Sequence, residues 1–80
     1  MLSRVGEFRL EELLDRITVN PRIMASKPVV RGTRITVDLI LKLLTAGAKP
    51  EEIAEDYRIS VEDVQAALLY AAKVLSLIHI

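Results

Sequence analysis

Residues 27–37 read KPVVRGTRITV, and this stretch places two short β-branched runs on either side of Gly32. Runs of this kind, separated by a gap that contains glycine, predict a tight hairpin. A two-residue type II′ turn needs a positive φ at its first position, which glycine adopts at little steric cost. In that register Val30 pairs with Ile35 on the face toward the core.

The same register sets Arg31 opposite Arg34, although like charges that face each other across strands are unfavourable. Two guanidinium groups beside the N–H groups of a glycine turn suit an anion, either a DNA phosphate or a carboxylate of a partner. Two alternatives are a solvated tip whose arginines splay apart and neutralisation by the acids of residues 50–57, within the fold or across a dimer. The candidate residues for binding DNA or a partner's anion in this segment are Lys27, Arg31, Gly32, Thr33 and Arg34.

The distribution of charge supports an anionic partner, although the formal net charge of the chain is zero. Residues 16–49 carry seven basic side chains and a single acid, a net charge of +6. Residues 1–15 carry two arginines and four acids, and residues 50–80 carry two basic side chains and six acids, net charges of −2 and −4. A basic middle between acidic ends indicates a binding role that the total charge hides.

Length and composition predict one domain of 80 residues with no cysteine, and hence no disulfide. No cluster of metal ligands occurs, so we expect neither a metal nor another cofactor. No apolar run approaches the ~20 residues of a membrane span and the start of the chain does not resemble a signal peptide, so we expect a cytoplasmic protein with no membrane partner.

The secondary structure predicted from local patterns is that of an α+β, mostly helical domain with a trihelical, winged-helix-like core. Its predicted elements are a short helix within residues 7–15, a strand over 17–19, β structure within 29–36, and helices over 37–46, 50–57 and 60–76. Thr36 is expected to cap the first core helix, and Gly47 to end it. Pro50 fits the first turn of the second helix, and Ser60 with Asp63 forms a near capping box for the third.

The hydrophobic content, 51% of the residues and mostly aliphatic, is large for so short a chain. The last helix is expected to turn Leu68 and Leu75 toward the core, while Leu69, Val74 and Ile78 lie on its other sides. Exposing several large aliphatic side chains is unfavourable, at roughly 1.5–3 kcal/mol each. The sequence therefore predicts a homodimer, with an interface formed by Leu39, Leu43, Leu69, Val74 and Ile78.

Residues 50–71 have the form of a helix-turn-helix, in which the start of the second helix contacts base edges in DNA readers. Ser60 and Gln65 suit such contacts, whereas Glu62 and Asp63 would repel phosphate. A trihelical core whose last helix only packs is the alternative, as is DNA contact through another surface.

Other polar residues do not predict catalysis. The acids Glu51, Glu52, Glu55 and Asp56 have i, i+4 spacing, but helix-terminus electrostatics and a solvated face explain them better than a bound cation. The single histidine, His79, is next to last, and no nucleophile–base set or phosphate loop is present. We therefore expect a non-enzymatic protein.

Four segments between residues 16 and 72 are similar in order and spacing to the domain of unknown function family 433: RITVNP, KPVVRGTRITV, LLTAGAKPEEIAEDY and ISVEDVQAALLYAA. The matching motif residues are Lys27, Pro28, Arg31, Gly32, Thr33, Arg34, Gly47, Glu52, Ile53 and Tyr70. The family usually has glycine where this chain has Ser26. Residues 1–15, the N-terminal helix, and residues 73–80, the apolar end, lie outside the resemblance.

The resemblance implies a small winged or trihelical helix-turn-helix fold, commonly dimeric, with an antitoxin-like role beside a PIN-like ribonuclease toxin. We therefore expect a non-enzymatic regulator that binds a PIN-like toxin partner and, in addition, operator DNA. The alternative is a structural module for protein interaction or dimerisation with no nucleic-acid role. Affinity for DNA that falls steeply with added salt distinguishes the two.

Overall fold

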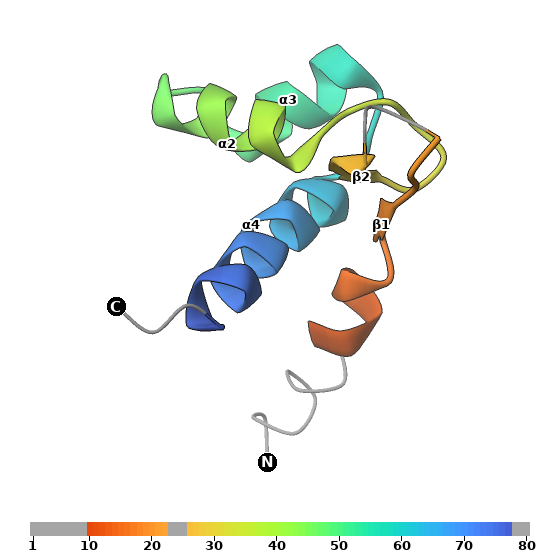
Figure 1. Cartoon of the computed structure of the whole chain (residues 1–80). Helices are drawn as coiled ribbons and strands as arrows, with labels where there is room; N and C mark the ends of the chain where they lie inside the picture. The colour runs from red at the N-terminus through yellow and green to blue at the C-terminus, as the bar shows by residue number, and fades with distance from the viewer. Residues whose placement is uncertain (1–9, 23–25, 78–80) are drawn as a thin grey trace.

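The computed structural model describes residues 10–22 and 26–77, which form a mostly helical α+β fold (Figure 1). Its elements are β1 (Ile17–Val19), β2 (Pro28–Val30), α2 (Val37–Thr45), α3 (Pro50–Tyr57) and α4 (Val61–Ser76). Residues 10–14 are helical and lead into β1, and this N-terminal helical segment is the described part of the helix predicted within residues 7–15. The three core helices and the first strand thus follow the prediction closely.

The strand pairing differs from the predicted hairpin. β2 pairs in antiparallel fashion with β1, in the register Ile17↔Val30, Thr18↔Val29 and Val19↔Pro28. The segment expected to be its partner contributes only an isolated bridge, Val29↔Thr36. The physical reason lies at Thr36, whose side chain accepts a 3.0 Å hydrogen bond from the Leu39 backbone N–H and so begins α2 before a second strand can extend.

The turn between these segments keeps the predicted register but not the predicted type. The Val30 N–H donates to the Ile35 carbonyl at 2.9 Å, as the register requires. However, the Thr33 N–H donates to the Val30 carbonyl at 3.0 Å, so Arg31 and Gly32 are the two central residues of the turn. Gly32 has a φ of +79° at the second central position, which is the pattern of a type II turn rather than type II′.

The hydrophobic core lies where the three helices meet, and α4 is its central element (Figure 1). Ile40 of α2, Ile53 of α3 and Val64 of α4 are almost completely buried, at 0%, 2% and 0% exposure. Val30 of β2 and Ile17 of β1 join the same cluster, so the two-stranded sheet covers one side of the helical core. In the described ranges, no helix has the length and apolar character needed to cross a membrane.

The helix ends follow the predicted capping. Pro50 occupies the first turn of α3, and Gly47 follows the α2 C-cap with a φ of +104°. Before α4, the Ser60 side chain accepts from the Asp63 N–H at 3.1 Å, and Asp63 Oδ2 accepts from the Ser60 N–H at 3.0 Å. The N-terminal end of α4 is therefore fixed by a complete capping box.

The faces of α4 are only partly those predicted. Val64 and Ala67 are buried, but Leu68 and Leu75, both expected to point inward, are 45% and 61% exposed. Among the residues predicted for a dimer interface, Leu39 and Leu69 are half-buried and Leu43 packs against the core, while Val74 is 38% exposed. The remaining predicted interface residue, Ile78, lies outside the described residues. The exposed apolar side chains of α4 thus include Leu68 and Leu75, which were expected to be inward, together with Val74, which belongs to the predicted interface.

Candidate functional site

The basic turn, residues 31–34, is held rigidly by the side chain of Thr33. The Thr33 hydroxyl donates to the Val30 carbonyl at 2.8 Å and accepts from the Ile35 N–H at 3.0 Å. These two bonds join the residues before and after the turn, and Gly32 supplies the positive φ between them. The two arginines are therefore attached to a fixed stretch of backbone rather than to a loose loop.

Arg31 is connected to the segment that precedes β1. Its backbone N–H donates to the Arg16 carbonyl at 2.7 Å, and its Nε donates to the Asp15 carbonyl at 2.7 Å. The guanidinium carries five N–H donors, so this contact leaves the two terminal amino groups for other acceptors. The neutral carbonyl orients the side chain without forming an ion pair, and on this side Arg31 also borders a hollow lined by Glu12, Asp15 and Asp63.

Arg31 and Arg34 both line one hollow at the surface, together with neutral groups from β1 and the turn. The remaining lining residues are Thr18, Asn20, Val29, Gly32 and Thr33. No acidic side chain lines this hollow, and the side chain of Arg34 is exposed. The turn thus presents two cations and several neutral hydrogen-bonding groups on one face, which suits an anionic ligand.

The arginines of the turn have no acidic partner among residues 10–22 and 26–77. The two salt bridges found there join Arg16 to Asp63 at 3.2 Å and Lys42 to Asp38 at 3.2 Å. The acids of α3 therefore do not neutralise the basic turn within the described chain. Lys27, the remaining predicted residue of this segment, is exposed one residue before β2.

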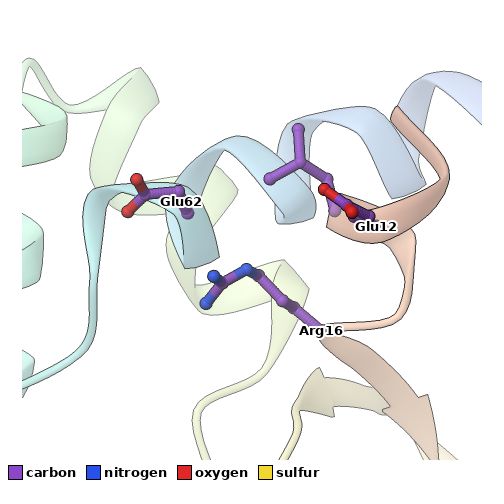
Figure 2. Close-up of a pocket in the computed structure, with 4 residues that line it drawn as sticks. Glu12, Arg16 and Glu62 are labelled. Atoms are coloured by element: carbon purple, nitrogen blue, oxygen red, sulfur yellow. The ribbon is translucent and has the colours of Figure 1, made fainter. Parts of the chain in front are cut away.

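The first turn of α4, which a helix-turn-helix reader would offer to DNA, is occupied by Arg16. The Arg16 NH1 group lies 3.2 Å from Asp63 Oδ1 and 3.3 Å from Ser60 Oγ. Figure 2 shows this side chain between Glu12 and Glu62, which line a hollow here together with Leu13. Ser60, predicted as a DNA contact, is thus engaged in capping and in the Arg16 contact, whereas Gln65 is exposed further along α4.

Two of the four acids of α3 stabilise the N-terminal end of the helix. Glu51 and Glu52 lie in its first turn, and Glu52 Oε1 accepts a 2.8 Å hydrogen bond from the Lys49 N–H. Glu55 and Asp56 are exposed on the same helix. No group of three or more potential metal ligands is present in the part of the chain that the structure describes.

Sequence reasoning found the arginines, Gly32 and Thr33 but missed Thr18 and Asn20, which line the same hollow. It also missed the Asp15 carbonyl that orients Arg31. These groups reach the turn because β1 pairs with β2, a contact between segments that local patterns do not reveal. The one available signal was the β-branched run at residues 17–19, whose only short partners in the sequence are the runs beside Gly32.

Comparison with known proteins places the chain in a family. A family model described as Protein of unknown function (DUF433) matches residues 17–71, which include the whole basic turn. The chain belongs to the DUF433 family. This assignment agrees with the resemblance in the sequence, and the family's description assigns no activity.

The DUF433 match is accompanied by a curated relative. Uncharacterized protein Rv2308 of Mycobacterium tuberculosis (strain ATCC 25618 / H37Rv) is 27% identical over 69 residues, which is 86% of this chain. The aligned region is 29% of that protein, so the chain spans less than a third of the relative's length. No solved structure matches the chain.

Proposed function

We propose that this DUF433 protein is a non-enzymatic regulator of the antitoxin type, whose basic turn binds the phosphate backbone of duplex DNA. One observation carries the proposal: Arg31 and Arg34 line the same hollow, which no acidic side chain lines, and neither forms a salt bridge in the described chain. Arg31 also borders a second hollow that contains acids, so Arg34 is the arginine that faces the acid-free hollow alone. Guanidinium groups bind phosphate oxygens through charge-assisted hydrogen bonds, and the Asn20 side chain, which lines the same hollow, adds a neutral group of a kind that contacts phosphates in DNA-binding proteins.

Phosphate is favoured over a partner carboxylate by the charge around the turn. The segment from residue 16 to residue 49 has a net charge of +6, and Arg22 and Lys27 are exposed in the stretch that leads to β2. A single carboxylate needs one or two cations, whereas a DNA backbone presents a row of phosphates. Several basic side chains distributed along this segment therefore suit a DNA backbone better than a single carboxylate.

The basic turn, and not α4, is the element that contacts DNA in this proposal. The first turn of α4 carries Glu62 and Asp63, and the nearby cation, Arg16, is already paired with Asp63, so a phosphate that approaches there would meet the charge of Glu62. In this proposal the wing of the trihelical core consists of the β1–β2 pair and the basic turn that follows β2. Such contacts position a protein on DNA without reading its sequence.

The antitoxin role adds a protein partner, a PIN-like ribonuclease toxin. This part of the proposal rests on the family resemblance of residues 16–72 rather than on the site. Co-expression of the chain with a PIN-like protein encoded beside it tests it directly. The proposal expects a complex that survives purification in high salt, and separate elution of the two proteins would contradict this part.

DNA binding is tested by titrating a labelled duplex of arbitrary sequence with the wild-type protein at 50 and 200 mM salt. Two to four phosphate contacts predict that affinity falls about 10- to 150-fold between these concentrations, from a slope of about −0.9 per phosphate. No binding at 50 mM salt, or binding that does not depend on salt, would contradict the proposal. If the protein does not bind DNA at 50 mM salt, the ligand expected for the basic turn is an acidic surface of a partner protein.

A second candidate function is that of a dimerisation module with no nucleic-acid role. The observation in its favour is the exposed apolar surface of α4, where Leu75 is 61% exposed and Leu77, just beyond the helix, is 80% exposed. Wild-type protein that associates but does not bind DNA at 50 mM salt would support this function over the first.

A further inference from the structure

Arg34 is the side chain of the basic turn that is free to reach away from the protein surface. It is exposed and forms no salt bridge in the described chain. Arg31, by contrast, is held against the Asp15 carbonyl, and the Thr33 hydroxyl forms both of its hydrogen bonds within the turn. Gly32 has no side chain. The outer part of the turn is therefore narrow, with a single free arginine.

The two-stranded sheet cannot enter a groove of DNA together with the turn. β2 lies between β1 and the bridge to Thr36, and its Val29 and Val30 are 1% and 2% exposed. The major groove, about 12 Å wide, accepts a whole helix or a two-stranded ribbon. The minor groove is about 6 Å wide, so it is the groove that suits a narrow turn with one projecting arginine.

Two of the side chains that line the hollow at the turn offer hydrogen-bond donors. Asn20 lines this hollow beside Arg34, and its Oδ1 accepts the Arg22 backbone N–H at 2.9 Å. That bond directs the amide oxygen toward the protein's own backbone and leaves the amino group, with its two N–H donors, for a ligand. The Arg34 guanidinium also donates and accepts nothing. The matching ligand is therefore a surface that presents acceptors.

Base pairs differ in the minor groove by one donor. A·T pairs present only acceptors there, adenine N3 and thymine O2, whereas G·C pairs add the guanine N2 amino group. Donors on the protein can bond to the first pattern, but in the second they meet a donor that they cannot pair. Runs of A·T pairs also have a narrow minor groove with enhanced negative potential, which attracts arginine. Both effects favour A·T-rich DNA.

We infer that Arg34 enters the minor groove of A·T-rich duplex DNA, where the Asn20 amino group donates to the base edges beside it. The inference rests on the proposed function and adds to it the class of DNA that the turn selects. Arg31, oriented by Asp15, stays at the rim of the groove and contacts the phosphate backbone. A cation in the groove lies between two rows of phosphates, so Arg34 also releases counterions and contributes to the salt dependence.

Three duplexes of equal length test the inference, with central A·T, G·C or inosine·cytosine pairs. Inosine lacks the guanine amino group, so its pair with cytosine resembles A·T in the minor groove and G·C in the major groove. At 50 mM salt, the wild-type protein should bind the A·T and inosine duplexes about five- to tenfold more tightly than the G·C duplex.

The failures of the inference and of the proposed function are distinguishable in this titration. Equal affinity for the three duplexes would overturn the inference and leave the proposed function standing. An inosine duplex bound as weakly as the G·C duplex would also overturn the inference, because the preference would then come from the major groove. No binding to any of the three would overturn both.

The variant Arg34→Lys separates entry into the groove from simple charge. It keeps the positive charge, but an ammonium is more strongly hydrated than a guanidinium and loses more on entering a narrow groove. Arg34→Lys should therefore bind the G·C duplex within about twofold of wild type and lose most of the preference for A·T. Arg58→Lys is the matched control, because Arg58 is exposed at the end of α3 and does not line the hollow. An Arg34→Lys protein with the preference of this control would overturn the inference.

Discussion

The Nε of Arg31 lies 2.7 Å from the main-chain oxygen of Asp15. The next residue along the chain, Arg16, accepts from the Arg31 N–H through its carbonyl and extends its side chain to Asp63. Two consecutive residues therefore connect the basic turn to the first turn of α4. The position of the turn relative to the helical core depends on this connection.

The connection to α4 predicts an order of stability losses. Arg16→Ala removes a partly exposed ion pair and should lower the free energy of unfolding by about 0.5–1 kcal/mol. Asp63→Ala removes the same pair and the capping box as well, so its loss should be larger, about 1–2 kcal/mol. Urea denaturation measures both. Asp38→Ala, which breaks the more exposed pair with Lys42, is the control, and a loss as large as that of Asp63→Ala would contradict this account.

The turn predicts that Gly32→Val lowers the free energy of unfolding by about 1–3 kcal/mol, because a β-branched residue resists a positive φ. A Cβ at position 32 would meet no atom within 4 Å, so the loss comes from the backbone and not from a clash. Gly32→Ala should therefore lower the melting temperature too, by a smaller amount. A Gly32→Val protein that melts at the wild-type temperature would show that the turn is wrongly described.

Arg58 ends α3 with a φ of +57°, a left-handed conformation that costs most residues roughly 1 kcal/mol. Arg58→Gly should therefore raise the free energy of unfolding by several tenths of a kcal/mol to about 1 kcal/mol. Ser26, with a φ of +69°, predicts a gain of the same sign for Ser26→Gly. Thermal melts compare both with Gln65→Gly within α4, which should be destabilised by about 1 kcal/mol. Destabilisation by Arg58→Gly would contradict the assigned helix end.

Much of the fold could be predicted from the sequence because its helix ends are encoded locally. Thr36, Gly47, Pro50 and Ser60 each act within one turn of the chain, and the structure places the helix boundaries within one residue of those predicted. The pairing of β1 with β2 could not be predicted in this way. It joins segments whose register is set by Ile17 and Val30 entering a common core rather than by a turn between them.

The candidate site and the exposed surface can also be predicted only where a feature is encoded within one short segment of the chain. The arginines and Gly32 could be predicted because one short segment contains them, whereas Thr18 and Asn20 belong to the site only through strand pairing. Helical periodicity correctly indicated an apolar α4, but it does not specify which stripe the neighbouring elements cover. The exposure of Leu68 and Leu75, which the periodicity assigns to the core side, is therefore a finding of the structure.

The two arginines of the turn are predicted to differ in their effect on stability. Arg31→Ala removes the hydrogen bond to Asp15 and should lower the free energy of unfolding by about 1 kcal/mol. Arg34→Ala removes an exposed side chain with no hydrogen bond in the described chain and should change stability by less than about 0.5 kcal/mol. Thermal melts of the two variants measure the difference. Equal losses would mean that Arg34 also has a structural contact.

The central claim, that the basic turn binds phosphate, is tested most directly by Arg34→Ala in a DNA titration at 50 and 200 mM salt. The control is Lys42→Ala, which removes the same charge from the last turn of α2, where its partner is Asp38. Arg34→Ala should weaken binding about fivefold at the lower salt concentration and reduce the salt slope by about 1. Lys42→Ala should retain the wild-type slope. An Arg34→Ala protein with the affinity and the salt slope of the Lys42→Ala control would contradict the claim.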